Sequence, residues 1–103
     1  MWNPFRKNYA TVSVSEAKAL LRSGATLIDV RSRGEWNSGH AREARHIPLD
    51  ALDSKLGSLP KSTPVVAICA SGMRSASAAR ILAANGYEAS TVRGGMAAWN
   101  RAS

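Results

Sequence analysis

Apolar residues along the chain fall into two kinds of pattern. Short runs of apolar and β-branched residues predict buried strands, and these runs occupy residues 26–30, 65–68 and 89–92. Helices are expected between them, near residues 13–24, 34–37, 49–56 and 75–85, with a short last helix after Gly94-Gly95. Ser13 and Glu16 have the spacing of a capping box, and Gly86 stands where a helix over 75–85 would end.

Strands that alternate with helices in this way predict βαβ units. We therefore expect an α/β fold with a small, open, mostly parallel sheet of four to five strands and helices on both faces. Ligands bind beyond the carboxyl ends of the strands in such sheets. Asp29-Val30-Arg31 ends one predicted strand and Cys69 follows another, so these residues should share one edge of the sheet.

Cys69 is the one cysteine of the chain, and its setting suits a nucleophile. It follows the strand 65–68 and precedes a small loop that leads into a helix. Backbone N–H groups in such a loop can converge on one point, and a helix start adds partial positive charge. Both favour the thiolate, which is the reactive form of cysteine. The alternative is a small buried apolar residue, which is the usual role of a free cysteine.

Composition narrows the kind of protein. The 103 residues are enough for one domain, which we place at 10–103 behind an N-terminal arm at 1–9. One cysteine excludes an internal disulfide and a thiolate zinc site, and His40 and His46 are not spaced as a helical metal pair. We therefore expect no metal and no cofactor.

The net charge of +7 comes from basic residues that scatter along the chain, unlike the basic stripe of a nucleic-acid binder. The charge serves either solubility or the attraction of small anions. No apolar stretch is long enough to span a bilayer, and residues 1–9 lack the apolar core of a signal peptide. We expect a cytoplasmic monomer that binds neither nucleic acid nor membrane.

With these features the sequence resembles the single-domain rhodaneses, which are thiosulfate sulfurtransferase-like proteins. Five separate segments carry the resemblance in order: 27–31, 35–40, 46–49, 69–75 and 93–99. The resemblance implies a persulfide on Cys69 and transfer of its outer sulfur from a small anionic donor such as thiosulfate to a thiol, cyanide or protein acceptor. It also implies that the loop binds the substrate, with these residues: Ala70, Ser71, Gly72, Met73, Arg74 and Ser75.

One segment departs from the family pattern. After Gly39-His40 the family continues with an apolar residue and a Pro-Gly turn, whereas this chain has Ala41-Arg42-Glu43. The departure changes the connection and leaves the cysteine loop intact.

The charged residues near the loop allow more than one interpretation. Arg74 either binds the anionic donor or braces the loop against Asp29 or Glu35. Arg31 and Glu35 are four apart and are predicted to pair in the short helix. Asp29 is predicted to be a buried hydrogen-bond acceptor, and Trp36 and Trp99 to be packing residues.

Two other functions stay open at this point. Cysteine-dependent phosphatases also use a loop that ends in arginine, but with five residues between the two, whereas four separate Cys69 from Arg74. The shorter loop should enclose a pocket that suits a sulfur atom better than a phosphate. A non-catalytic module with the same fold is the third possibility, and the retained Cys69 speaks against it.

Overall fold

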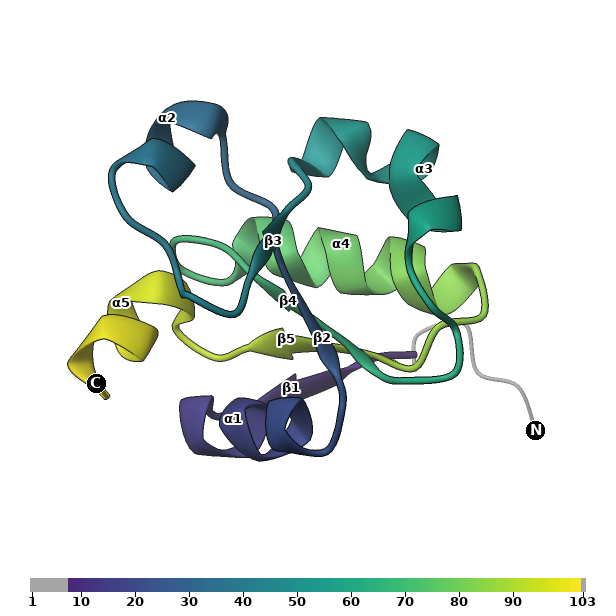
Figure 1. The fold of residues 1–103 in the computed structure, drawn as a ribbon, viewed down its shortest axis with the longest axis horizontal. Coiled ribbons are helices and arrows are strands. Elements are labelled where there is room, and N and C mark those ends of the chain that lie inside the picture. Colours follow the sequence, from purple (N-terminus) through teal and green to yellow (C-terminus); the bar gives the residue numbers. More distant parts are fainter. Residues whose placement is uncertain (1–7, 103) are drawn as a thin grey trace.

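The computed structural model describes residues 8–102, and within that range five strands form one parallel sheet. The strand order across the sheet is β1-β5-β4-β2-β3, as Figure 1 shows. The strands are β1 (Ala10–Val12), β2 (Thr26–Asp29), β3 (Arg45–His46), β4 (Val65–Ile68) and β5 (Ala89–Val92). The α/β class and the parallel sheet are thereby confirmed. Most of the predicted arm, residues 1–7, lies outside the described residues.

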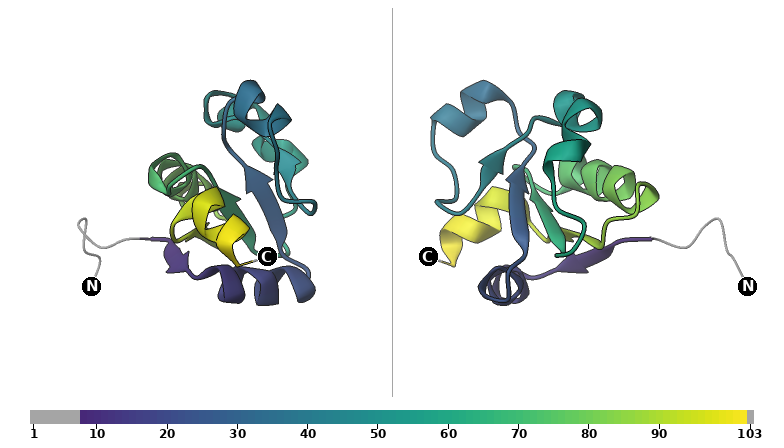
Figure 2. Two further views of the ribbon diagram at one scale, coloured as in Figure 1. Left: turned by 90° about the vertical axis from the view of Figure 1, so that its left-hand side faces the viewer. Right: turned by 45° about the vertical axis from the view of Figure 1, so that its right-hand side comes forward.

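The helices cover the sheet on both of its faces. They are α1 (Val14–Arg22), α2 (Arg33–Asn37), α3 (Leu52–Lys55), α4 (Met73–Ala84) and α5 (Gly95–Arg101). In the right-hand view of Figure 2, α1 is seen end-on beneath the sheet while α3 and α4 lie above it. No helix in the described part of the chain is long and apolar enough to cross a membrane.

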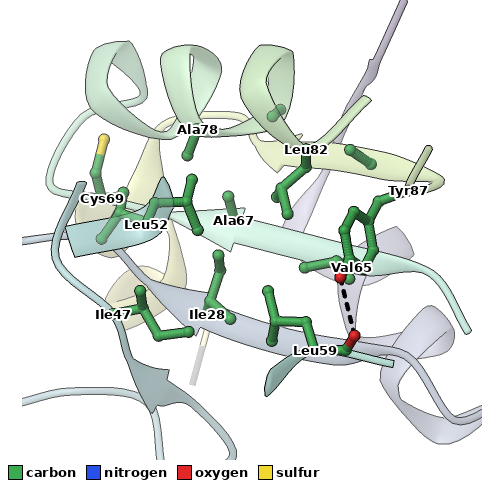
Figure 3. Close-up of a cluster of buried hydrophobic side chains, with 13 residues drawn as sticks. Ile28, Ile47, Leu52, Leu59, Val65, Ala67, Cys69, Ala78, Leu82 and Tyr87 are labelled. Carbon is green, nitrogen blue, oxygen red and sulfur yellow. Dashed lines mark hydrogen bonds between the residues drawn. The ribbon is translucent and has the colours of Figure 1, made fainter. Parts of the chain in front are cut away.

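Strand β4 divides its side chains between two cores, because successive residues of a strand point to opposite faces. Val65 and Ala67 pack with the apolar residues of α3 and α4, whereas Val66 and Ile68 pack with those of α1 and α5. Cys69 continues the first set, so its side chain faces α4 (Figure 3). The alternation thus decides which helix meets the sulfur.

Capping residues fix where two of the helices begin. Glu16 donates its backbone N–H to Ser13 Oγ at 3.0 Å, and Ser13 returns its N–H to Glu16 Oε1 at 2.8 Å, so the predicted capping box is confirmed. A second box joins Ser32 and Glu35 at the start of α2. This box holds the Glu35 carboxylate at the end of the sheet where the strands finish.

The structure differs from the predicted elements at three places. The continuous helix expected over 49–56 is wrong: a 3₁₀ turn at Leu49–Ala51, α3 and a second 3₁₀ turn at Leu56–Ser58 follow one another. Helix α4 begins at Met73, two residues earlier than expected, since Gly72 already caps it. Strands β1 and β3 lie at the edges of the sheet and lack the apolar run of a buried strand, so the sequence pattern does not predict them.

Candidate active site

Cys69 lies at the carboxyl end of the central strand β4, and 1% of its surface is exposed. The neighbouring strand β2 ends beside it, because Asp29 is in register with Ile68 and Val30 donates its N–H to the Ile68 carbonyl at 3.0 Å. The predicted meeting of Asp29 and Cys69 at one sheet edge is confirmed. The other predicted loop residues follow directly, with Ala70–Gly72 in the turn and Met73–Ser75 in the first turn of α4.

The turn directs donors at the sulfur. Gly72 donates its backbone N–H to Cys69 Sγ over 3.1 Å. Gly72 has a φ of +123°, a backbone conformation that residues with a side chain rarely adopt. The thiol itself donates to Ser75 Oγ over 3.4 Å, so the turn and the helix both bond the sulfur.

These contacts shift the pKa of the Cys69 thiol. Burial acts to raise the pKa of Cys69, but hydrogen bonds from the Ser75 hydroxyl and from the backbone of Ser75, Gly72 and Ser71 outweigh it. The net pKa therefore lies below the ordinary value for cysteine. A lower pKa increases the fraction of thiolate at neutral pH, and the thiolate is the nucleophile.

Helix α5 supports the loop from behind. Met96 donates its N–H to the Cys69 carbonyl at 2.7 Å. A Cβ at Gly95 would collide with the carbonyl oxygen of Cys69 and would lie 2.6 Å from that of Ala70. Only glycine at position 95 therefore lets α5 approach the loop this closely. The close contact holds the backbone carbonyls of Cys69 and Ala70 on the side of the loop that faces α5. Gly95 lies in segment 93–99, one of the five that resemble the family, but the sequence does not reveal its contact with the loop.

Arg74 is bound to Glu35 through two parallel bonds. Its Nη1 and Nη2 donate to Oε1 and Oε2 at 2.6 and 2.9 Å. Hydrogen bonding from Arg74, with the Ser32 backbone next in weight, lowers the pKa of Glu35 to about 2. The bracing interpretation of Arg74 is thus realised on Glu35, joining α4 to α2.

Arg31 does not pair with Glu35, so that prediction is wrong. Its Nη2 donates to Asp29 Oδ2 at 2.8 Å and to the Gly39 carbonyl at 2.7 Å. Arg31 lies before Ser32, the N-cap of α2, and is therefore outside the helix. The i, i+4 spacing of a helix thus does not bring it beside Glu35. Asp29 is fully buried and, as expected, accepts hydrogen bonds, which come from the backbone N–H, Nε and Nη2 of Arg31.

The histidines serve packing. The rings of His40 and His46 stack on Trp36, with centroids at 3.5 and 4.8 Å. Each ring also bonds a backbone carbonyl, His40 that of Trp36 and His46 that of Arg31. Among residues 8–102 no group of three or more His, Cys, Asp or Glu side chains is placed to hold a metal ion.

A hollow of about 410 Å³ opens beside Arg74. Its walls come from the segments that follow β2 and β3 and from the start of α4: Val30, Ser32, Pro48, Leu49, Asp50 and Arg74. Met73, by contrast, turns outward and is 82% exposed. Of the predicted substrate-binding residues, Gly72 and Ser75 bond the sulfur directly, whereas Arg74 lines the hollow and bonds Glu35.

Known proteins resemble this chain over 71% to 90% of its length. A putative sulfurtransferase of Bacillus subtilis, YtwF, is 40% identical over 73 residues, which is 71% of each chain. The human single-domain sulfurtransferase TSTD1 is 31% identical, with a TM-score of 0.77 over 90% of this chain and 96% of its own. CoADR-RHD of Bacillus anthracis is 33% identical with a TM-score of 0.83, and this chain spans only 17% of its length. Residues 13–102 match the rhodanese-like domain, and the chain therefore belongs to the rhodanese-like family.

Proposed function

We propose that this chain moves a sulfane sulfur from thiosulfate or a related donor to a thiophilic acceptor through a persulfide on Cys69. The observation that carries the proposal is the bond from the Gly72 N–H to Cys69 Sγ at 3.1 Å, inside a turn that lowers the pKa of the thiol. A sulfurtransferase-like role also agrees with the names of the relatives.

The reaction takes place in two displacements. The Cys69 thiolate attacks the outer sulfur of thiosulfate, so a new S–S bond forms on Cys69 and the donor leaves as sulfite. The acceptor then attacks the outer sulfur of the persulfide: cyanide gives thiocyanate and a thiolate gives a new persulfide. Cys69 leaves as thiolate. The persulfide carries its negative charge on the outer sulfur, and preorganised N–H donors stabilise such a charge without a metal.

The hollow beside Arg74 suits an anionic donor. Arginine has five N–H donors, and the bonds to Glu35 occupy two of them. The remaining donors are free to hold a sulfonate while Glu35 keeps the guanidinium in place. Bracing and donor binding are therefore compatible roles of Arg74.

The setting and partners follow from the same chemistry. A reactive thiol persists in a reducing compartment such as the cytoplasm. The donor is a small anion, the acceptor is a thiol, cyanide or the cysteine of a protein, and the chain acts as a monomer without cofactor or nucleic acid.

Intact mass spectrometry after incubation with thiosulfate tests this function. We expect a mass gain of one sulfur that cyanide or a thiol removes. Cys69→Ser is the matched control and should show no gain. A gain that persists in Cys69→Ser would place the sulfur elsewhere, and no gain with thiosulfate or another sulfane donor would favour a non-catalytic module.

A further inference from the structure

A buried threonine stands behind the residues that bond the sulfur. Thr91 Oγ1 lies 2.6 Å from Ser75 Oγ, and either hydroxyl can be the donor. Thr91 is 4% exposed and Ser75 is fully buried. Thr91 comes from β5, next to β4, and is in register with Ala67, two residues before the cysteine. Neither the cysteine loop nor any sequence motif includes it.

Ser75 has one hydroxyl proton and three neighbours. Besides Thr91, the Gly72 carbonyl lies 3.2 Å and Cys69 Sγ lies 3.4 Å from Ser75 Oγ. In the thiol form, Cys69 donates to Ser75 and Ser75 donates to Gly72. The thiolate has no proton to donate, so it gains a bond only if the Ser75 proton turns towards it.

When the Ser75 proton rotates towards the sulfur, the Gly72 carbonyl keeps a partner, because Ala76 also donates its N–H to this carbonyl at 3.0 Å. If Ser75 donates its proton to Thr91, however, no proton remains on Ser75 to bond the sulfur. When Thr91 is the donor, Ser75 Oγ is satisfied and its proton is free for Sγ. Linked hydroxyls also polarise one another and strengthen the last bond of the chain.

We infer that Thr91 is a positioning residue: its hydroxyl donates to Ser75 and thereby directs the Ser75 proton to the anionic sulfur on Cys69. The inference rests on the proposed function, because an anionic sulfur is what sulfur transfer requires. It extends that function to a residue on a strand outside the loop.

Charged groups near this sulfur also affect its titration, and substitutions at Thr91 do not change these groups. Arg74 on α4 interacts electrostatically with Cys69, and Asp29 at the end of β2 interacts with the same guanidinium. Arg31 holds Asp29 in its ion pair. Substitutions at Thr91 leave all of these in place, so a change in the titration of Cys69 can be assigned to the hydroxyl.

Two pairs of proteins isolate the hydroxyl of residue 91. Wild type and Thr91→Val have side chains of nearly equal shape, and Thr91→Ser and Thr91→Ala differ by one oxygen atom. The rate at which iodoacetamide alkylates Cys69, measured against pH, reports the thiolate and needs no sulfur donor. Thr11→Val is the control, because Thr11 pairs with Thr91 across the sheet on β1 but is not among the residues that bond the loop.

We expect Thr91→Val and Thr91→Ala to shift the alkylation profile to higher pH and to slow the reaction at neutral pH by about twofold to tenfold, the effect of losing one hydrogen bond. Thr91→Ser and Thr11→Val should follow wild type. Either pair decides alone if a member of the other does not fold. Coincident profiles within a folded pair would overturn the inference, whereas a shifted profile without any persulfide on wild type would overturn the proposed function and leave the inference standing.

Discussion

Arg74 links two parts of the candidate site, because it lies on α4 and binds Glu35 on α2. Its side chain is 39% exposed while it holds Glu35 through two bonds, so solvent and solutes still reach the guanidinium. An exposed ion pair contributes little to stability, commonly below about 1 kcal/mol. The pair is therefore better suited to hold the guanidinium at the hollow than to stabilise the fold.

Removing Arg74 should affect the binding of the donor. We expect Arg74→Ala to lower kcat/KM for thiosulfate by about tenfold to a hundredfold, because a hydrogen bond to a charged group contributes roughly 1.5–3 kcal/mol. A neutral persulfide donor should lose less, since it has no sulfonate to hold. Steady-state rates with both donors and thermal melts on the same samples measure the effect.

Glu35→Gln is the matched control for that experiment. It removes the charge that braces Arg74 and keeps the guanidinium. If donor binding is the main role of Arg74, this variant should lose less activity with thiosulfate than Arg74→Ala, because the guanidinium remains although the Glu35 charge no longer braces it. An equal loss with both donors and a lower Tm in Arg74→Ala would instead make Arg74 a structural brace only.

The carboxyl of Glu35 also predicts how the protein responds to acid. Its pKa is about 2 in the folded protein, below the ordinary value of 4.5, so the folded state binds this proton less readily than the unfolded state. The stabilising effect is complete above pH 4.5 and is lost as the pH falls to about 2. Urea unfolding of wild type and Glu35→Gln should therefore differ at neutral pH and converge at about pH 2. A constant difference over that range would contradict the ion pair.

Among the elements, we expect the loop that leads from β4 into α4 to select the anion. Four residues separate Cys69 from Arg74, and the third of them, Gly72, donates its N–H to the sulfur over 3.1 Å. Turnover of an aryl phosphate should be negligible, because the short loop suits the single outer sulfur of a persulfide better than a whole phosphate group. Insertion of one glycine after Gly72 should weaken sulfur transfer by moving the donors away from Sγ.

Assays of both activities on wild type and the insertion variant test the role of loop length. Unchanged sulfur transfer after the insertion would show that loop length does not select the substrate. A Cys69-dependent phosphatase rate that matches sulfur transfer in wild type would reverse the ranking of the two functions.

The elements also show what the sequence could reveal. Strands β2, β4 and β5 are buried, so their short runs of apolar and β-branched residues predicted them, whereas the two-residue strand β3 lies at an edge and carries Arg45 and His46. The cysteine loop was predictable because its residues are contiguous. Thr91 was not, since folding brings it to Ser75 from 16 residues away, and the sequence offered Glu35, 39 residues from Arg74, as only one of two possible partners of that arginine.

For the whole molecule, the net charge of +7 predicts a dependence on ionic strength. A positive surface raises the rate at which anions arrive, and salt screens this attraction over about 10 Å at 0.1 M. We expect kcat/KM for thiosulfate to fall as sodium chloride rises, while a neutral donor is nearly unaffected. Parallel salt titrations with both donors measure this, and an equal response of the two would assign the charge to solubility alone.

The pairing of β1 with β5 has a consequence for how the protein is made. Residues 10–12 are synthesised well before their partner strand at 89–92, so β1 cannot join the sheet until that strand has been made. Contacts so far apart in the chain form late in folding. Thr91 and Gly95 arrive with that same late segment. We therefore expect the Cys69 thiol to reach its lowered pKa only after β5 and α5 have packed against β4.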